Sequence, residues 1–365
     1  MLLFACNAAL QLFLLAGSWE NDRRNKALAA TVQGRAWFTN MFHERSFQIA
    51  LVIWVAASLA VFPLSGGKLP LNRPAMANFS VCFQLIASIV GLAITLVQMT
   101  IVYFLTRRRA IPDMASRAPD AAVARREVWL LWAYGALVLL AGRWIGLRVF
   151  GEGIGLHLNG SLFGMTRMVS PQEVWVWTFY NFVFLAVIPY VIFRARGYSR
   201  ESLNLKSANL RNDTLVIAVI MAMGITFDLL GGGFLKLSGH QMLLGATLTF
   251  VTHLLGTGLP VMIFIYAILF PRYLKLTGSR VATVLLGGVS YAVLHVFEYW
   301  TLYDSIPHAL LSAIFVLLTF VPPGLMKSYL TLRTANAWVH LWGYHAISPH
   351  VTADTPMIVK IFGIR

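Results

Sequence analysis

The amino-acid sequence predicts an all-α, polytopic bundle of transmembrane helices with about nine or ten spans. Three observations predict this fold class. Of the 365 residues, 58% are hydrophobic and only 12% are charged, a composition far more apolar than that of a soluble domain. Apolar runs long enough to cross about 30 Å of hydrocarbon as helices recur along the whole chain. The basic residues gather in every second loop between these runs, which is the pattern of an integral membrane protein.

About ten apolar runs are the predicted spans. In chain order they are Leu2–Gly17, Ser46–Leu64, Phe79–Leu105, Val128–Phe150, Val174–Phe193, Thr214–Phe234, Gln241–Phe270, Val281–Trp300, Ala309–Met326 and Ala335–Val351. The first run is short, and it lacks the basic start and the small-residue cleavage site of a secretory signal. We therefore keep two interpretations of Leu2–Gly17, a span or a signal-like segment.

Two of the later runs have marked features. Ser170 and Glu173, with a proline directly after the serine, form a capping-box pattern that predicts the start of the fifth helix. The seventh run, Gln241–Phe270, is longer than one span needs, and Gly256, Gly258 and Pro260 interrupt it near its middle. A break at this depth frees backbone groups that must find partners inside the protein. It indicates either the lining of a cavity or a kink that packing tolerates.

The basic loops explain the net charge of +15. They contain Arg23, Arg24, Lys26, Arg35 and Arg45; Arg107, Arg108, Arg109, Arg117, Arg125 and Arg126; Arg194, Arg196, Arg200, Lys206 and Arg211; and Arg272, Lys275 and Arg280. The intervening loops contain few, chiefly Lys68, Arg73, Arg167 and Lys236. By the positive-inside rule the basic loops are predicted to be cytoplasmic. The expected partner of this charge is the lipid bilayer with its anionic headgroups, and no nucleic acid.

The segment Thr106–Glu127 is rich in Ala, Arg, Asp and Pro and is predicted to be a solvated linker. It divides the chain into residues 1–127, the N-terminal helices with the basic linker; 128–193, two connecting spans; and 194–365, the core helices. No loop is long enough for a soluble domain, so any functional site is expected inside the bundle.

Five histidines fall within the apolar runs, namely His253, His295, His340, His345 and His350. An ionisable side chain at bilayer depth is costly and is by default a candidate for function. His295 is followed by Glu298, and on a helix this spacing places both on one face, where the carboxylate could orient the imidazole. The alternatives are that Glu298 is only the interfacial end of its span and that His295 makes a structural hydrogen bond between helices.

Two further sets of ionisable residues lie in the apolar runs. Asp228 and His253 lie at comparable depths in their spans and could join one buried cluster or simply neutralise each other. His340 and His345 are five residues apart, about 140° around a helix, so that at most one of them is expected to face a given site. The two cysteines, Cys6 and Cys82, form neither a disulfide framework nor a metal-binding pair. The sequence leaves open which cofactor or metal, if any, the protein binds.

Several short motifs follow one another in the last 170 or so residues, a length that holds several spans. They are Arg196-Gly197-Tyr198-Ser199-Arg200-Glu201; Phe270-Pro271-Arg272-Tyr273-Leu274 with Gly278-Ser279; Tyr291-Ala292-Val293-Leu294-His295; and Leu330-Thr331-Leu332-Arg333-Thr334 with Trp338 and His345. In order and spacing, from about Arg194 to His350, they resemble the CAAX-protease and bacteriocin-processing (CPBP) family of intramembrane proteases. The resemblance implies a core of helices in which glutamate and histidine activate the water that attacks a peptide bond.

The resemblance implies catalytic roles for His295 and His345. The chain departs from the family at the first motif, a glutamate pair followed by an arginine, where it has Val261, Met262 and Tyr266. After His345, the place of the family's asparagine is taken by Pro349. Glu298 is then the nearest candidate in sequence for the missing carboxylate.

Three interpretations of function follow. The first is a CPBP-like intramembrane endopeptidase, a hydrolase acting on membrane-bound or prenylated peptides, or an inactive pseudoenzyme of this family that only binds a hydrophobic or lipidated peptide. The second is a transporter or lipid-binding bundle with a buried cluster of His, Asp and Glu. The third is a structural partner of another membrane complex.

Overall fold

The computed structural model describes residues 43–67, 69, 71, 79–151, 153–162, 169–231 and 233–365. Within these ranges the chain forms helices and loops and no strand. Six of the described helices are long and apolar enough to cross a membrane, which confirms the predicted all-α, multi-pass bundle. They are Arg45–Ser65, Val81–Thr106, Ala121–Phe150, Pro171–Ala195, Gly239–Thr277 and Ile306–Thr334. The predicted first span, Leu2–Gly17, lies outside the described residues.

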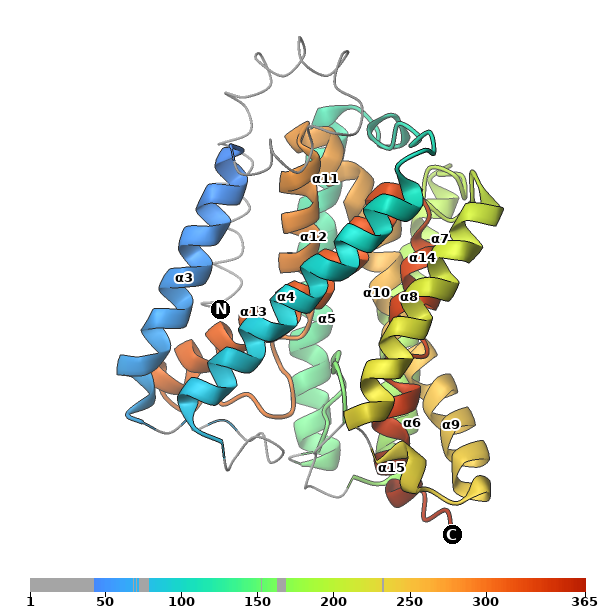
Figure 1. Ribbon diagram of the computed structural model, residues 1–365. Coiled ribbons are helices and arrows are strands. Elements are labelled where there is room, and N and C mark those ends of the chain that lie inside the picture. Colours follow the sequence, from blue (N-terminus) through green and yellow to red (C-terminus); the bar gives the residue numbers. More distant parts are fainter. Residues whose placement is uncertain are drawn as a thin grey trace.

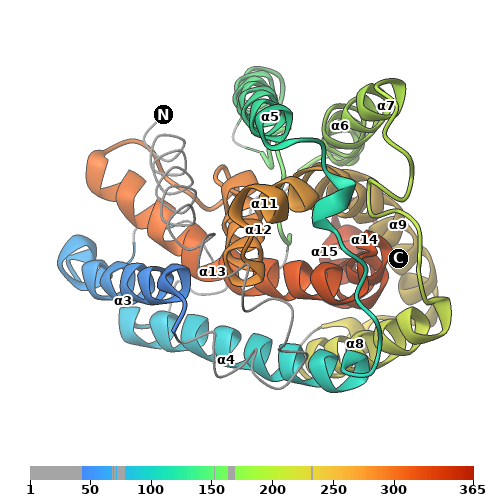
Figure 2. The ribbon, with the colours of Figure 1, turned by 90° about the horizontal axis from the view of Figure 1, so that it is seen from above.

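One outer layer of the bundle consists of α3 (Arg45–Ser65), α4 (Val81–Thr106) and α8 (Leu210–Gly231). Figure 2 shows these three helices side by side along one edge of the molecule. Apart from Val61, the side chains of α3 are not buried, and large apolar side chains such as Leu59 remain exposed. An exposed apolar surface of this kind suits contact with lipid tails.

The opposite layer consists of α5 (Ala121–Phe150), α6 (Pro171–Asn181), the π-helical η3 (Phe182–Val187) and α7 (Ile188–Ala195) (Figure 2). The helix start predicted at Ser170 is present, since its side chain accepts a hydrogen bond from the amide of Glu173. The side chain of Glu173 does not complete the capping box. It accepts a hydrogen bond from the amide of Ile154, 2.7 Å away, and so ties α6 to the preceding loop.

A broken helix forms part of the interior. It comprises α9 (Gly239–His253), η5 (Leu254–Gly258), α10 (Leu259–Val261), η6 (Met262–Leu269) and α11 (Phe270–Thr277), of which η5 and η6 are π-helical. The break falls at Gly256 and Pro260, as predicted from the sequence. Glycine is needed at position 256 because a Cβ atom there would lie 2.8 Å from the ring of Trp177. π-Helical turns of this kind often occur at functional sites.

Two more helices, α12 (Arg280–Leu294) and α13 (Ile306–Thr334), pack closely in the middle of the bundle. Gly288 and Gly324 allow this approach, because a Cβ atom on Gly324 would lie 2.8 Å from the backbone of Gly288. The predicted span Val281–Trp300 is shorter as a helix than expected and ends at Leu294. The following turns are held from outside the helix, since Asn159 Oδ1 accepts a hydrogen bond from the amide of Tyr299.

The end of the chain departs most from the sequence prediction. Instead of one helix over Ala335–Val351, the structure has α14 (Ala337–His340) continued by the π-helical η7 (Leu341–His345), then a turn, then α15 (Val351–Ile361). The side chain of Asn336 caps α14 by accepting a hydrogen bond from the amide of Trp338. Because the chain turns between η7 and α15, α15 packs against α9 and α8.

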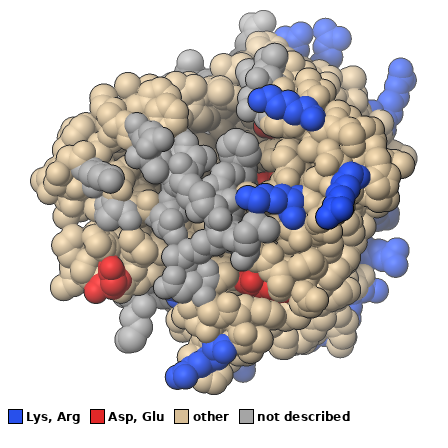
Figure 3. Space-filling model, turned by 90° about the horizontal axis from the view of Figure 1, so that it is seen from below, with Lys and Arg blue, Asp and Glu red and all other residues tan. Residues whose placement is uncertain are grey.

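The two ends of the bundle differ in charge. The loops after α4 and α7 and the turn between α11 and α12, all predicted to be basic, lie at the same end of the bundle (Figure 1). At the opposite end, uncharged residues make up most of the described surface, and Lys and Arg occur at separate positions (Figure 3). The fold therefore gathers the basic loops that the sequence places far apart.

Candidate functional site: a buried cluster of histidines and an aspartate

The five histidines of the apolar segments are all buried, each at most 1% exposed. They come from α9, from the turn after α12, and from the region between α14 and α15. The rings of His253 and His350 are 4.5 Å apart between centroids, those of His350 and His345 5.2 Å, and those of His345 and His340 6.3 Å. Four of the five histidines thus form one continuous row. With Asp354 they are called the histidine cluster below.

Asp354 is the carboxylate of the histidine cluster. Its Oδ2 lies 3.2 Å from Nε2 of His253 and 3.1 Å from Nδ1 of His350, while its Oδ1 accepts a hydrogen bond of 2.6 Å from the hydroxyl of Ser161. The side chain is fully buried. A buried carboxylate is stable only when it is paired and hydrogen-bonded. The four-residue spacing from His350 and the packing of α15 on α9 together supply these partners.

The ring nitrogens show which atoms are available for chemistry. Nδ1 of His253 lies 3.1 Å from the carbonyl oxygen of Thr249, an atom that only accepts, so this nitrogen is the protonated one. In the described part of the chain, Nε2 of His350 and both ring nitrogens of His345 have no hydrogen-bond partner. Buried polar atoms without partners are rare and costly in folded proteins. Such atoms inside a cluster suit binding of a water molecule, an ion or a substrate group.

His295, the first predicted catalytic residue, lies beside the row. Its Nδ1 donates a hydrogen bond of 2.7 Å to the carbonyl of Tyr291, and its ring stacks on that of Phe320 at 4.3 Å. The ring of Tyr291 contacts His295 at 4.3 Å and His345 at 6.0 Å. The two histidines of the predicted motifs, His295 and His345, therefore contact the same tyrosine ring.

Glu298 does not share a helical face with His295, because α12 ends at Leu294 and the following residues form turns. Its Oε1 accepts a hydrogen bond of 2.5 Å from the amide of Gly160. The carboxylate is thereby used to hold the loop of residues 153–162 against the turn after α12. Asp354, and not Glu298, is the carboxylate bound to the row of histidines.

Asp228 supports the cluster from α8. Its Oδ2 accepts hydrogen bonds from Ser348 at 2.7 Å and from Thr352 at 3.0 Å, on either side of His350 in sequence. The sequence-based suggestion that Asp228 and His253 belong to one region is compatible with this placement. His253 contacts Asp354 directly, whereas Asp228 holds the turn on which His350 lies.

Two residues near the cluster were missed in the sequence. Lys327 on α13 is 1% exposed, and its Nζ lies 3.5 Å above the ring centroid of Tyr291. It was overlooked because the predicted span ended at Met326, one residue earlier. Asp354 was overlooked because the last predicted span ended at Val351. The spacing of His350 and Asp354, one helical turn apart, was the signal that could have found the pair.

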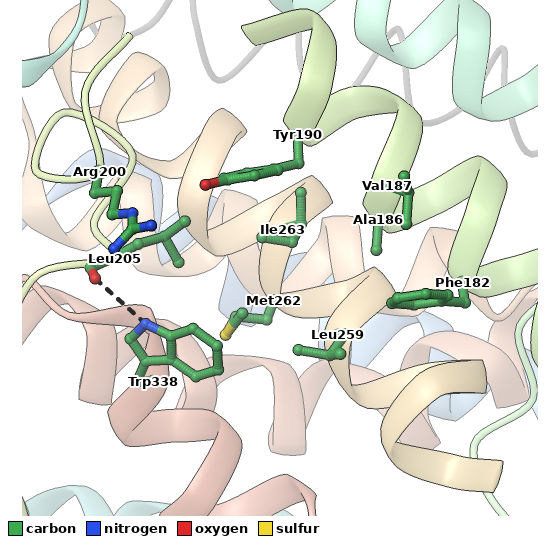
Figure 4. Close-up of a pocket in the computed structure, with 10 residues that line it drawn as sticks. All are labelled: Phe182, Ala186, Val187, Tyr190, Arg200, Leu205, Leu259, Met262, Ile263 and Trp338. Atoms are coloured by element: carbon green, nitrogen blue, oxygen red, sulfur yellow. Dashed lines mark hydrogen bonds between the residues drawn. The ribbon is translucent and has the colours of Figure 1, made fainter. Parts of the chain in front are cut away.

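A groove of about 430 Å³ lies between η3 and α7 on one side and the broken helix on the other. Figure 4 shows Arg200, Leu205 and Trp338 at one end of it, and Phe182 and Leu259 at the other. Its walls are mostly apolar, with Arg200 and Tyr190 as polar groups. Trp338 lies on α14, the same short helix as His340, so the groove and the histidine cluster share an element.

The fold and the site define a polytopic helical membrane protein with a buried cluster of histidines and an aspartate. No protein-family model matches this chain, and no curated protein or solved structure is similar enough to count as a match. The resemblance to the CPBP family accordingly remains a prediction from the sequence motifs.

Proposed function

We propose that this protein is a membrane-embedded hydrolase of the endopeptidase class and that the histidine cluster is its catalytic centre. One observation supports this proposal above the others. Asp354 holds Nδ1 of His350, and the opposite nitrogen of the same ring has no partner among the described residues. A carboxylate that orients an imidazole whose second nitrogen is open is the arrangement by which enzymes activate a nucleophile.

In this mechanism His350 takes a proton from a water molecule at Nε2, and the oxygen of that water attacks the carbonyl carbon of a peptide bond. Asp354 keeps the ring oriented and stabilises the positive charge that the imidazole gains. Protonated His350 then passes this proton to one open nitrogen of His345, in the neighbouring ring, and the other nitrogen of His345 gives its own proton to the leaving amine, so that both rings end neutral. Asp354 takes the part that the resemblance assigns to glutamate, although it comes from a different element.

The groove supports a hydrophobic or lipidated peptide as the substrate. Its apolar walls between η3 and η6 suit a prenyl or other hydrocarbon chain. Trp338 and Leu259 line the groove (Figure 4). Trp338 lies on α14 together with His340, and Leu259 lies in α10 of the broken helix, whose first part, α9, ends at His253. We place the basic end of the bundle in the cytoplasm, so that Arg200 lies on that side of the bilayer.

The experiment uses the full-length protein in liposomes with a fluorogenic farnesylated peptide and the same peptide without the lipid. His350→Ala is expected to lower turnover about 10²- to 10⁴-fold, the usual contribution of a general base. The matched control is His308→Ala, because His308 also pairs with an aspartate four residues away, Asp304, but lies at the surface. Equal cleavage by both variants would contradict the proposal. Peptide binding without any cleavage by the wild type would identify a non-catalytic relative.

A second candidate function is a proton-coupled transporter. The observation that favours it is the row of imidazoles, whose ring centroids are 4.5 to 6.3 Å apart from His253 to His340. Chains of ionisable groups inside membranes relay protons in pumps and transporters. A pH gradient across the liposomes tests this function. Proton flux in the wild type that His345→Ala abolishes, without peptide cleavage, would favour the transporter.

A further inference from the structure

We infer that His253, His350 and Asp354 bind a divalent transition-metal ion of the zinc type. These three side chains each present one ligand atom, and the three atoms lie within 4.8 Å of one another in the buried interior. Any role of the ion in hydrolysis rests on the proposed function, whereas its binding is a property of the three ligands alone.

The two distances from the carboxylate to the histidine nitrogens match the edges of a tetrahedral site. Bonds of about 2.0 to 2.1 Å from zinc to nitrogen or oxygen give tetrahedron edges of about 3.3 Å. Oδ2 of Asp354 lies 3.2 Å from Nε2 of His253 and 3.1 Å from Nδ1 of His350. With all three atoms within 4.8 Å of one another, they can surround a single ion. Binding through Nδ1 of His350 requires the neutral tautomer that carries its proton on Nε2, so the proton moves from Nδ1 to Nε2 when the ion enters.

The hydrogen bond at the far side of His253 indicates that its Nε2 is a ligand atom. Nδ1 of this ring donates to the carbonyl oxygen of Thr249, so neutral His253 points the lone pair of Nε2 at the carboxylate of Asp354. Two electron-pair donors facing each other at 3.2 Å repel unless a cation lies between them. Metal-binding histidines typically donate their other N–H to a backbone carbonyl in this way. The competing explanation is a proton on Nε2, which the experiment below distinguishes.

The surroundings of the three ligands hold them in place. Ser161 donates to the second carboxylate oxygen of Asp354, at 2.6 Å. Asp228 holds Ser348 and Thr352, the residues two before and two after His350. Such outer contacts orient ligands and raise the affinity of a metal site. The loop 153–162, α8, α9 and α15 all contribute to this one position.

The chemistry of the ligands selects the class of ion. Two imidazoles with one carboxylate suit zinc and its transition-metal neighbours, whereas magnesium and calcium prefer sites made only of oxygen. Three protein ligands leave a fourth position for water, as in catalytic zinc sites. With the ion in place His350 is a ligand with its proton on Nε2, so the role of general base proposed above passes from His350 to His345, whose ring lies 5.2 Å away.

The test measures bound zinc in the full-length protein, purified in detergent with a tag that contains no histidine, since polyhistidine binds the same ions. After dialysis against zinc, elemental analysis is expected to find one equivalent in the wild type and in His308→Ala. His253→Ala, His350→Ala and Asp354→Asn are expected to lose stoichiometric zinc. Ser161→Ala is expected to keep the site with about 10- to 100-fold weaker affinity. Cobalt bound in place of zinc should give the visible absorption of a tetrahedral site.

Each outcome bears on one conclusion. No stoichiometric zinc in the wild type, or equal zinc in Asp354→Asn, would overturn the metal site and favour a proton on His253. If a ligand variant fails to fold, the weaker binding expected of Ser161→Ala decides instead, and unchanged affinity in that variant would overturn the inference. Zinc binding without peptide cleavage leaves the metal site in place and removes the proposed hydrolase. Full cleavage by protein stripped of metal with a chelator leaves the hydrolase and removes the ion from it.

Discussion

At the scale of single residues, the interior of this protein contains charged groups that a purely structural bundle would avoid. Lys327 is the clearest example, since it is 1% exposed and no carboxylate among the described residues lies within ion-pair distance of it. Its ammonium group rests instead on the ring of Tyr291, which also contacts His295 and His345. A basic side chain that is buried on an aromatic ring beside a histidine cluster is a candidate for contact with a negatively charged group, and under the proposed function it would stabilise the charge that develops on the substrate.

Lys327→Met tests this role. Methionine has a similar length and no charge, and replacing a buried charge by an apolar side chain is often neutral or stabilising. We expect the melting temperature in detergent to stay the same or to rise. Turnover of the farnesylated peptide should fall about 10²-fold, as when one preorganised group at an active site is lost. The control is Lys206→Met at an exposed position. A lower melting temperature with normal turnover would show that Lys327 is structural.

At the scale of elements, a buried ion pair joins α5 to α11 at the basic end of the bundle. Nε of Arg272, a fully buried side chain, donates to Oε2 of Glu127 at 2.7 Å. The hydroxyl of Tyr198, which follows α7, donates to Oε1 of Glu127 at 2.8 Å. Burial raises the pKa of Tyr198, and the hydrogen bond to Glu127 raises it further. This hydroxyl therefore stays protonated and remains a donor. Glu127 thus connects α5 to α11 and to the segment that follows α7.

Glu127→Ala is expected to destabilise the protein by about 3 to 5 kcal/mol, because it leaves the charge of Arg272 buried without its partner. The measurement is the shift of the unfolding transition in detergent. Glu201→Ala is the matched control, since Glu201 pairs with Lys206 at the surface and such exposed pairs contribute at most about 1 kcal/mol. Equal effects of the two variants would mean that Glu127 does not stabilise this end of the bundle.

At the scale of the whole molecule, the basic loops at one end of the bundle predict its orientation in the membrane. We expect Ser116→Cys, in the loop after α4, to react with a membrane-impermeant thiol reagent only from the cytoplasmic side. Asp304→Cys, between α12 and α13 at the opposite end, should react only from the other side. Both are made after Cys6 and Cys82 are replaced by alanine, since these are the two cysteines of the chain. Labelling with the sides exchanged would reverse the orientation.

Much of the fold was predictable because helices are local. Apolar runs of the length that a membrane span needs, such as those of α3 and α4, predict their helices with boundaries within two residues. The break in the seventh run was visible in Gly256 and Pro260. The early end of α12 and the division of the last run were not. Both depend on side chains from other segments, such as Asn159, that supply hydrogen bonds to backbone no longer in a helix.

The sequence by itself determined that this is a helical membrane protein, that its basic loops alternate with weakly charged ones, and that histidines lie among its apolar segments. Only the tertiary structure decided which of them meet. His253 and Asp354 are about a hundred residues apart, and they pair because the chain turns between η7 and α15 and returns along α9. Local periodicity describes the face of one helix. It does not specify which faces pack together, and in this protein the packing is what joins a carboxylate to the histidines.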